Sequence, residues 1–358
     1  MGLHQFSAEA GSEIRELASG IDAFYVSGRA SIPPEFLEEL DRLKGMAQGG
    51  GRSVPIVLGG AEFHVQPGGF GKYRYCLRNE IAQIGFTPSD RLPALRIQPR
   101  AEYLHGLGPL PAVDELAEML GREVGPIALS VSRLDLFADF QGWTLEGDSR
   151  RRFVCRARTR DLYEEGEELT GFVFGRRDTG TVMARIYDKE REREKKGTDY
   201  WRVIWGDRYV PGVPVWRVEF QLGRQAVTEY GIDTPSEAVG GAGGLWASVT
   251  SEWLTYRVPS DDATRSRWAI APEWRSVQLA RVREEAAGLA RVRAASRQGT
   301  VRRLAPRLVG DLTDLAAALG VDSVGEVLPV VPGICVAYEK DSGRTFADRA
   351  HEKMGRAR

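Results

Sequence analysis

Three segments of the sequence carry an arginine two residues before an aspartate, a tyrosine or a glutamate. The three pairs are Arg133 and Asp135, Arg185 and Tyr187, and Arg217 and Glu219. Carboxylate oxygens suit a hard divalent cation such as Mg²⁺ or Mn²⁺. Arginine suits a phosphodiester, and a tyrosine oxygen can act as a nucleophile toward phosphorus. Together the pairs point to phosphoryl transfer.

Each pair lies in a segment with the pattern of a β-strand that has one apolar and one polar face. Side chains alternate across a strand, so residues two apart share a face. In "SVSRLDLFADF", "VMARIYDK" and "VWRVEFQL" the arginine and its partner share one face, and apolar residues occupy the other. A solvated sheet face would give the same alternation in any one strand. Its repetition in three strands favours a shared site.

Strand geometry separates the two aspartates of the first segment. Asp139 shares a face with Asp135 but lies four residues further on, which is about 13 Å along an extended strand. One ion therefore cannot bind both carboxylates. We predict that Asp135 and Glu219 are the metal ligands, and that Asp139 supports the site indirectly or lies at the surface.

The elements that must position these strands follow a mixed pattern. Glycine-separated, strand-like runs fill much of residues 21–100, and helices are expected at 8–18, 32–47, 113–123 and about 188–196. Beyond residues 240–244 helical segments dominate. The sequence predicts an α+β fold, with a mixed, largely antiparallel sheet and a C-terminal helical, arginine-rich appendage. We expect a catalytic region over 1–235, a helical region over 245–310 and a tail over 311–358.

Charge is distributed unevenly along the chain. The net charge of −1 and the pI near 6.5 argue mildly against nucleic-acid binding. Residues 265–307, however, hold eleven arginines and only three glutamates. Arginine can clamp phosphates and read guanine edges. We therefore predict that this region binds DNA through Arg281, Arg283, Arg291 and Arg293; a basic, solvated helix face is the alternative.

Several other classes of protein find no support in the sequence. There is no run of 18 apolar residues, and the first twenty residues have no secretory pattern, so we expect a cytoplasmic protein without a membrane span. Three scattered cysteines form neither a disulfide framework nor a zinc knuckle. Walker, GxSxG and GxGxxG motifs are missing, so ATP use and serine hydrolysis have no support.

Four segments, "SRLDLFADF", "GFVFGRR", "ARIYDKERE" and "WRVEFQL", in this order resemble the replication initiation factor (Rep_trans) family. Its members are rolling-circle replication initiators of plasmids and phages, and related relaxases of integrative conjugative elements. The resemblance covers residues 130–225, and 20–280 by strand pattern. It implies a DNA nickase that uses a tyrosine and a divalent metal, Mg²⁺ or Mn²⁺. The implied partners are double- and single-stranded origin DNA, a host helicase and polymerase, and a second copy in a homodimer.

The resemblance also implies roles for single residues. It places the nucleophile in the Tyr-x-Lys segment, here Tyr187 to Lys189, and acidic residues at Asp135 and Glu219. The residues agree with this reading, because a helix that begins after Asp188 would bring positive potential to an incoming phosphate. Lys189 would also favour the phenolate form of the tyrosine.

Four arginines complete the predicted site. Arg185 and Arg217 would balance charge in the transition state, together with Arg133, which is also a candidate DNA contact. Arg176, in the turn of "GFVFGRR", could hold a phosphate or be an exposed hairpin arginine.

Histidine placement favours this family over another class of nickase. The four histidines are His4, His64, His105 and His351, and none lies within two residues of another. The clustered pair that binds metal in the His-hydrophobic-His superfamily is therefore missing, and a carboxylate site is preferred.

The sequence thus predicts a rolling-circle replication initiator that nicks one DNA strand at a specific site through a tyrosyl-phosphodiester intermediate. A conjugative or mobilisation relaxase would share this chemistry. A non-catalytic DNA-binding regulator and a hydrolytic nuclease without a covalent step are the alternatives from other classes. A trapped protein–DNA adduct would separate the first two from the others.

Overall fold

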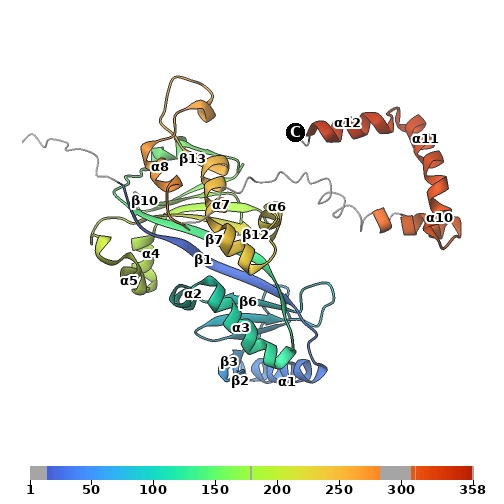
Figure 1. Ribbon diagram of the computed structural model, residues 1–358, viewed down its shortest axis with the longest axis horizontal. Coiled ribbons are helices and arrows are strands. Elements are labelled where there is room, and N and C mark those ends of the chain that lie inside the picture. Colours follow the sequence, from blue (N-terminus) through green and yellow to red (C-terminus); the bar gives the residue numbers. More distant parts are fainter. Residues whose placement is uncertain (1–13, 178–179, 283–307, 311, 357–358) are drawn as a thin grey trace, which may run out of the picture. The chain divides into compact units, whose positions relative to one another are not determined.

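A computed structural model describes residues 14–177, 180–282, 308–310 and 312–356 (Figure 1). The chain forms two compact units, Met1–Ala290 and Arg291–Arg358. The strands of the first unit are β1 (Arg15–Arg29), β2 (Val54–Leu58), β3 (Ala61–Val65), β4 (Tyr75–Arg78), β5 (Ala82–Phe86), β6 (Leu95–Pro99), β7 (Ala128–Gln141), β8 (Phe153–Cys155), β9 (Arg160–Glu165), β10 (Glu168–Phe174), β11 (Val182–Asp188), β12 (Trp216–Gly223) and β13 (Leu254–Tyr256). Its helices are α1 (Pro34–Gly50), α2 (Ala101–Leu107), α3 (Pro109–Val124), α4 (Lys189–Lys196), α5 (Tyr200–Trp205), α6 (Arg224–Glu229), α7 (Pro235–Ser248) and α8 (Pro272–Gln278).

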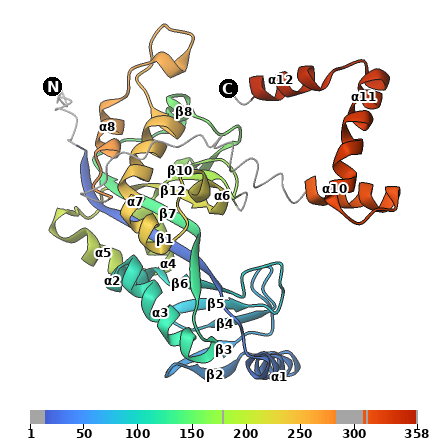
Figure 2. The ribbon, with the colours of Figure 1, turned by 45° about the vertical axis from the view of Figure 1, so that its right-hand side comes forward.

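Eleven strands form one sheet in the order β2-β3-β4-β5-β6-β1-β7-β12-β11-β10-β9. Each pairing within it is antiparallel, which confirms the predicted α+β class with a largely antiparallel sheet. β1 pairs with β7 from Arg15↔Gln141 to Arg29↔Ala128. β6 joins β1 only at Val26–Gly28, and β12 joins the second half of β7. The long β1–β7 ribbon therefore connects two wings, β2–β6 and β9–β12 (Figure 2).

The two faces of the sheet differ in chemistry, as strand alternation requires. Leu136 on β7 and Val218 and Phe220 on β12 are fully buried in the main core. The indole of Trp246, on α7, packs edge-on against Phe220 with ring centroids 5.5 Å apart. The arginine pairs therefore lie on the opposite face of the sheet.

A smaller core covers part of this polar face. It contains Trp201 and Trp205 of α5, together with Phe137, Leu17 and Val215. α5 therefore closes one end of the face, while the rest of the face extends across the sheet.

Capping residues set the start and end of α4, the helix that follows the predicted nucleophile. The Asp188 carboxylate accepts a hydrogen bond from the backbone N–H of Arg191, at 3.1 Å. Gly197 ends the helix with φ of 65°, in the left-handed region that glycine adopts without strain. Asp188 is thus the N-cap of the helix that the sequence predicts to begin after it.

Two element predictions differ from the structure. Residues 15–18 of the expected helix at 8–18 belong to β1, where Leu17 is buried while its neighbours are more exposed. The glycine-rich stretch 240–244, read as the start of an appendage, lies inside α7. α7 carries the buried residues Leu245 and Trp246, so this helix belongs to the core of the first unit.

The second unit contains short helices. They are α10 (Val324–Val327), α11 (Val331–Ser342) and α12 (Phe346–Arg356), preceded by helical residues at 308–310 and 312–319. Among the described residues, no single helix is both long enough and apolar enough to cross a membrane. The segments Leu308–Leu319 and Val324–Ser342 meet these two criteria only when they are taken together as a bent pair.

Candidate active site

The register of three neighbouring strands brings the predicted site residues together. β12 lies between β7 and β11. Glu219 on β12 is directly opposite Arg185 on β11, and Gln221 is directly opposite Asp135 on β7. Side chains at directly opposed positions lie about 5 Å apart at Cβ. The polar groups of the three strands therefore form one cluster, here called the carboxylate cluster, on the sheet face opposite the main core.

Glu219 is the centre of this cluster. Its carboxylate is 1% exposed and accepts a hydrogen bond from the Tyr187 hydroxyl, with 3.0 Å between Tyr187 Oη and Glu219 Oε2. The Arg185 guanidinium donates to Glu219 Oε1 and lies 5.5 Å from the centroid of the Tyr187 ring. The structure thus joins Glu219 on β12 to the Arg185 and Tyr187 pair on β11.

Asp135 is the second buried carboxylate of the cluster. Arg133 Nε donates to Asp135 Oδ1 at 2.7 Å, and a second guanidinium nitrogen donates to Oδ2. Burial and the negative charge of Glu219 raise the pKa of Asp135 to about 7, although Arg133 acts in the opposite direction. The two carboxylates are therefore close enough to repel each other, which is the setting that a cation relieves.

The donor chemistry fits a hard divalent cation once an amide oxygen is included. Among the described residues, no group of three or more His, Cys, Asp and Glu side chains is arranged to hold a metal. Gln221, however, is 5% exposed, and its buried Oε1 accepts no hydrogen bond from the described residues. With Asp135 and Glu219 it offers three oxygen donors of the kind that Mg²⁺ and Mn²⁺ prefer. Sequence reasoning missed Gln221, although it lies two residues after Glu219 on the same strand face.

The environment of Tyr187 differs from the expected one. Burial, and next the Glu219 carboxylate, raise its pKa well above the ordinary value of 10. Lys189 Nζ lies 5.8 Å from the Tyr187 ring centroid, but it is paired with Glu192. Burial and Glu219 thus act against the phenolate form that Lys189 is predicted to favour, and the Glu219 carboxylate is placed to accept the phenolic proton.

Tyr187 is accessible through a small pocket. The pocket has a volume of about 230 Å³, and Tyr163, Arg185 and Tyr187 contribute to its lining. Gly171, on β10, is directly opposite Tyr187, and a Cβ there would lie 2.7 Å from the carbonyl oxygen of Ile186. Glycine at this position therefore allows β10 to pair closely beside the tyrosine.

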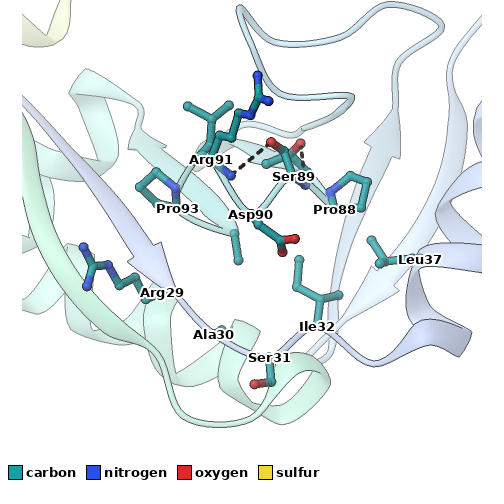
Figure 3. Close-up of a pocket in the computed structure, with 13 residues that line it drawn as sticks. Arg29, Ala30, Ser31, Ile32, Leu37, Pro88, Ser89, Asp90, Arg91 and Pro93 are labelled. Atoms are coloured by element: carbon teal, nitrogen blue, oxygen red, sulfur yellow. Dashed lines mark hydrogen bonds between the residues drawn. The ribbon is translucent and has the colours of Figure 1, made fainter. Parts of the chain in front are cut away.

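A larger pocket, of about 550 Å³, lies elsewhere in the first unit (Figure 3). It is lined by Arg29 at the end of β1, by the segment that follows, including Ser31, and by the β5–β6 connection at 87–94. None of its lining residues belongs to the carboxylate cluster. Pocket size alone would therefore direct attention away from the place where the predicted reactive groups meet in the described part of the chain.

Arg217 has a different role from the predicted one. It is fully buried, and its Nε and Nη2 donate to the two carboxylate oxygens of Asp139 at 2.7 and 2.8 Å. Its Nη1 donates to Asp22 at 2.7 Å, and its guanidinium lies 4.1 Å from the Phe137 ring centroid and 4.0 Å from that of Trp201. This guanidinium is engaged inside the small core, so direct contact with a phosphate is ruled out in this arrangement.

Asp139 is correspondingly a core residue and not a surface residue. It is 0% exposed, and besides Arg217 it accepts a hydrogen bond from the Trp205 indole at 2.8 Å. Arg217 is directly opposite both Asp139 and Tyr187 in the strand register. The ion pair therefore supports the strand segment that carries the tyrosine.

The candidate DNA contacts are only partly described. Arg176 is exposed in the turn after β10. Arg281 is exposed after α8, and its backbone N–H donates to the Glu16 carboxylate at 3.2 Å. Arg283, Arg291 and Arg293 lie outside the described residues. Trp274, which also lies within the arginine-rich residues 265–307, is fully buried.

Comparison with known proteins finds a similar solved structure at low identity. No family model matches the chain, and no curated protein matches it. Among solved structures, the chain is similar to a rolling circle replication initiator protein from Geobacillus stearothermophilus. The two share 15% identity with a TM-score of 0.45, over 76% of this chain and 100% of the other. The roles of the residues described above are therefore argued from their own geometry.

Proposed function

We propose that the first unit is a site-specific DNA nickase that starts rolling-circle replication, with Tyr187 as the nucleophile. The observation that carries the proposal is the 3.0 Å hydrogen bond from the Tyr187 hydroxyl to Glu219, beside the Arg185 guanidinium. A nucleophile held by a base, next to a cation able to bind a phosphate, is the arrangement that covalent phosphoryl transfer needs.

The bond changes would be those of a transesterification. The Tyr187 oxygen forms a bond to phosphorus, and Glu219 takes the phenolic proton. The bond from phosphorus to the 3′ oxygen breaks, and that oxygen takes a proton from solvent to leave as a 3′ hydroxyl. The 5′ phosphate stays on the tyrosine, so the energy of the phosphodiester is retained and rejoining needs no ATP.

Charged side chains of the cluster would orient the substrate and stabilise the added charge. Arg185 lies beside the tyrosine and Arg133 beside Asp135, and each is about 23% exposed, so both can contact a phosphate from the open face. Lys189, at the start of α4, adds positive potential near the ring. Asp135, Glu219 and Gln221 would hold the divalent cation, which supplies polarisation of the scissile phosphate when bound.

The partners under this proposal are origin DNA of a plasmid or phage in the cytoplasm, and the host machinery that extends the new 3′ end. A polymerase would use the 3′ hydroxyl, and a helicase would open the duplex. A conjugative relaxase would use the same residues and chemistry. The genes that flank this one separate the two roles.

Metal binding tests the three-oxygen site directly. We expect Gln221→Ala to weaken Mn²⁺ binding roughly ten-fold or more, which is the scale of losses at metal sites when a supporting group is removed. Binding is measured by titration calorimetry or by the electron paramagnetic resonance signal of free Mn²⁺. The control Gln221→Glu keeps an oxygen donor and should bind at least as tightly as the wild type.

Asp135→Ala and Glu219→Ala should lose Mn²⁺ binding and nicking together. If Gln221→Ala binds Mn²⁺ like the wild type while Asp135→Ala and Glu219→Ala do not bind it, the two carboxylates alone form the metal site. If none of the three changes Mn²⁺ binding, the cluster is not a metal site.

The arginine-rich segment gives a second test in solution. Each phosphate contact that is neutralised contributes about 0.9 to the slope of log affinity against log salt. Changing Arg281, Arg283, Arg291 and Arg293 together to glutamine should therefore flatten that slope by a few units and weaken binding to origin duplex. Arg42→Gln, on the exposed face of α1, is the control. An unchanged slope would show that these arginines do not contact DNA.

A further inference from the structure

A row of alternating arginine and aromatic side chains leads away from Asp135 across the polar face of the sheet. The Arg133 guanidinium lies 4.9 Å from the Tyr25 ring centroid. The Arg96 guanidinium lies 5.6 Å from the Tyr25 centroid and 5.3 Å from that of Phe70. We call Arg133, Tyr25, Arg96 and Phe70 the arginine–aromatic ladder.

The strand register places the ladder on the same face as the carboxylate cluster. Tyr25 on β1 is directly opposite Arg133 on β7, which shares its strand face with Asp135. Arg96 on β6 is directly opposite Ser27, two residues after Tyr25. The ladder therefore continues the polar face from the site across the central ribbon and into the β2–β6 wing.

The ladder residues on β1 and β6 are partly open to solvent, while their neighbours along the strand are not. All four of its residues are half-buried. Phe24 and Val26, on either side of Tyr25, are fully buried, as is Ile97 beside Arg96. The ladder side chains thus project from the face that the core does not use.

Additional cations lie at the far end of the ladder. Phe70 belongs to the glycine-rich segment between β3 and β4, which also carries the exposed Lys72. Arg78, on β4, is exposed as well and is directly opposite Gln83 on β5. Positive charge and aromatic rings therefore occur together along this path.

We infer that the ladder binds the single-stranded DNA that flanks the scissile phosphate; this inference rests on the proposed nicking function. Proteins that bind single strands combine a cationic track with aromatic rings on which bases stack, and arginine planes add to the stacking. From β11 to β6 the path crosses four strand spacings, roughly 19 Å. It can therefore hold a few nucleotides on the side of the site that faces the β2–β6 wing.

The roles along the path follow from side-chain chemistry. Tyr25 and Phe70 offer ring faces to bases, while Arg96 and Lys72 are positioned for phosphates. Stacking on a ring does not depend on base identity, so this track adds affinity for single strands without adding sequence specificity.

Binding of a sequence-neutral probe tests the inference with the full chain. Binding is measured by fluorescence anisotropy with a labelled oligothymidylate of about twenty nucleotides. We expect Tyr25→Leu and Phe70→Leu each to bind it roughly ten-fold more weakly, which is the loss of affinity expected when one base no longer stacks on a ring. Tyr25→Phe keeps the ring and should bind within two-fold of the wild type. Tyr338→Leu, the same change at an exposed tyrosine of the second unit, is the matched control.

Several outcomes would overturn the inference. Unchanged oligothymidylate binding by Tyr25→Leu and Phe70→Leu, at unchanged melting temperature, would show that the ladder only packs against itself. If Tyr25→Phe also bound the oligothymidylate more weakly, the loss could not come from a missing ring and would reflect altered folding of the protein. Equal competition by duplex DNA of the same length would contradict a single-strand track. Tyr187→Phe should bind the probe normally, so failure of the nicking proposal would appear as a missing adduct and not as lost binding.

Discussion

Tyr187→Phe should form no covalent adduct with DNA, while its affinity for the same DNA stays within a few-fold of the wild type. The change removes the one oxygen that would bond to phosphorus and leaves the ring in place between Arg185 and Lys189. The adduct is measured as a protein–DNA band that survives denaturing electrophoresis after incubation with supercoiled plasmid carrying the origin and Mg²⁺ or Mn²⁺.

The neighbouring tyrosines provide the control for this experiment. Tyr209 donates its hydroxyl hydrogen bond to Glu190, at 2.6 Å, and not to either carboxylate of the cluster. Tyr209→Phe should therefore form the adduct at the wild-type level. If the Tyr187 variant still formed the adduct, Tyr200 and Tyr209 would become the candidates for the nucleophile.

Asp139→Ala should destabilise the first unit by about 3–5 kcal/mol, the usual cost of removing one partner of a buried ion pair. Arg217 is fully buried and would keep only Asp22 as an anionic partner. The Trp205 indole would also lose its acceptor. Urea denaturation followed by tryptophan fluorescence measures the change, because Trp201 and Trp205 lie in the same small core.

An exposed ion pair gives the matched comparison. Glu39 and Arg42, on α1, pair at 2.7 Å with side chains 43% and 58% exposed. Glu39→Ala should cost less than about 1 kcal/mol, since solvent screens such pairs. An Asp139→Ala variant with wild-type stability would contradict the structural role of the Arg217 ion pair. The sequence predicts that Asp139 supports the site indirectly or lies at the surface, and a large loss of stability would exclude the surface position.

The sequence predicts the faces of the strands well, because side-chain alternation depends only on the local backbone. That is why Asp135, Glu219 and Tyr187 could be assigned to polar faces before the structure was known. Register between strands is a tertiary property, set by hydrogen bonding and by packing of the opposite face. The pairing of Arg217 with Asp139, and the placement of Gln221 opposite Asp135, could not be predicted for this reason.

Burial explains the other differences. The pKa of Tyr187 depends on the groups that surround it in three dimensions, and the sequence shows only its neighbours Arg185 and Lys189. The glycines at 240–244 resemble a linker when composition is considered alone. In the structure they form part of α7, whose Leu245 and Trp246 pack into the core and stabilise a helix that glycine disfavours.

The β1–β7 ribbon has a consequence for how this protein folds as it leaves the ribosome. Arg15 pairs with Gln141, so the first strand must wait for more than a hundred further residues before its partner exists. Contacts between residues so distant in sequence give a high contact order, and such topologies fold slowly. Since β12 pairs with both β7 and β11, the polar face is completed only once the chain has been made as far as Gly223. We therefore expect truncated nascent chains that end before Gly223 to remain open to proteolysis and dependent on chaperones.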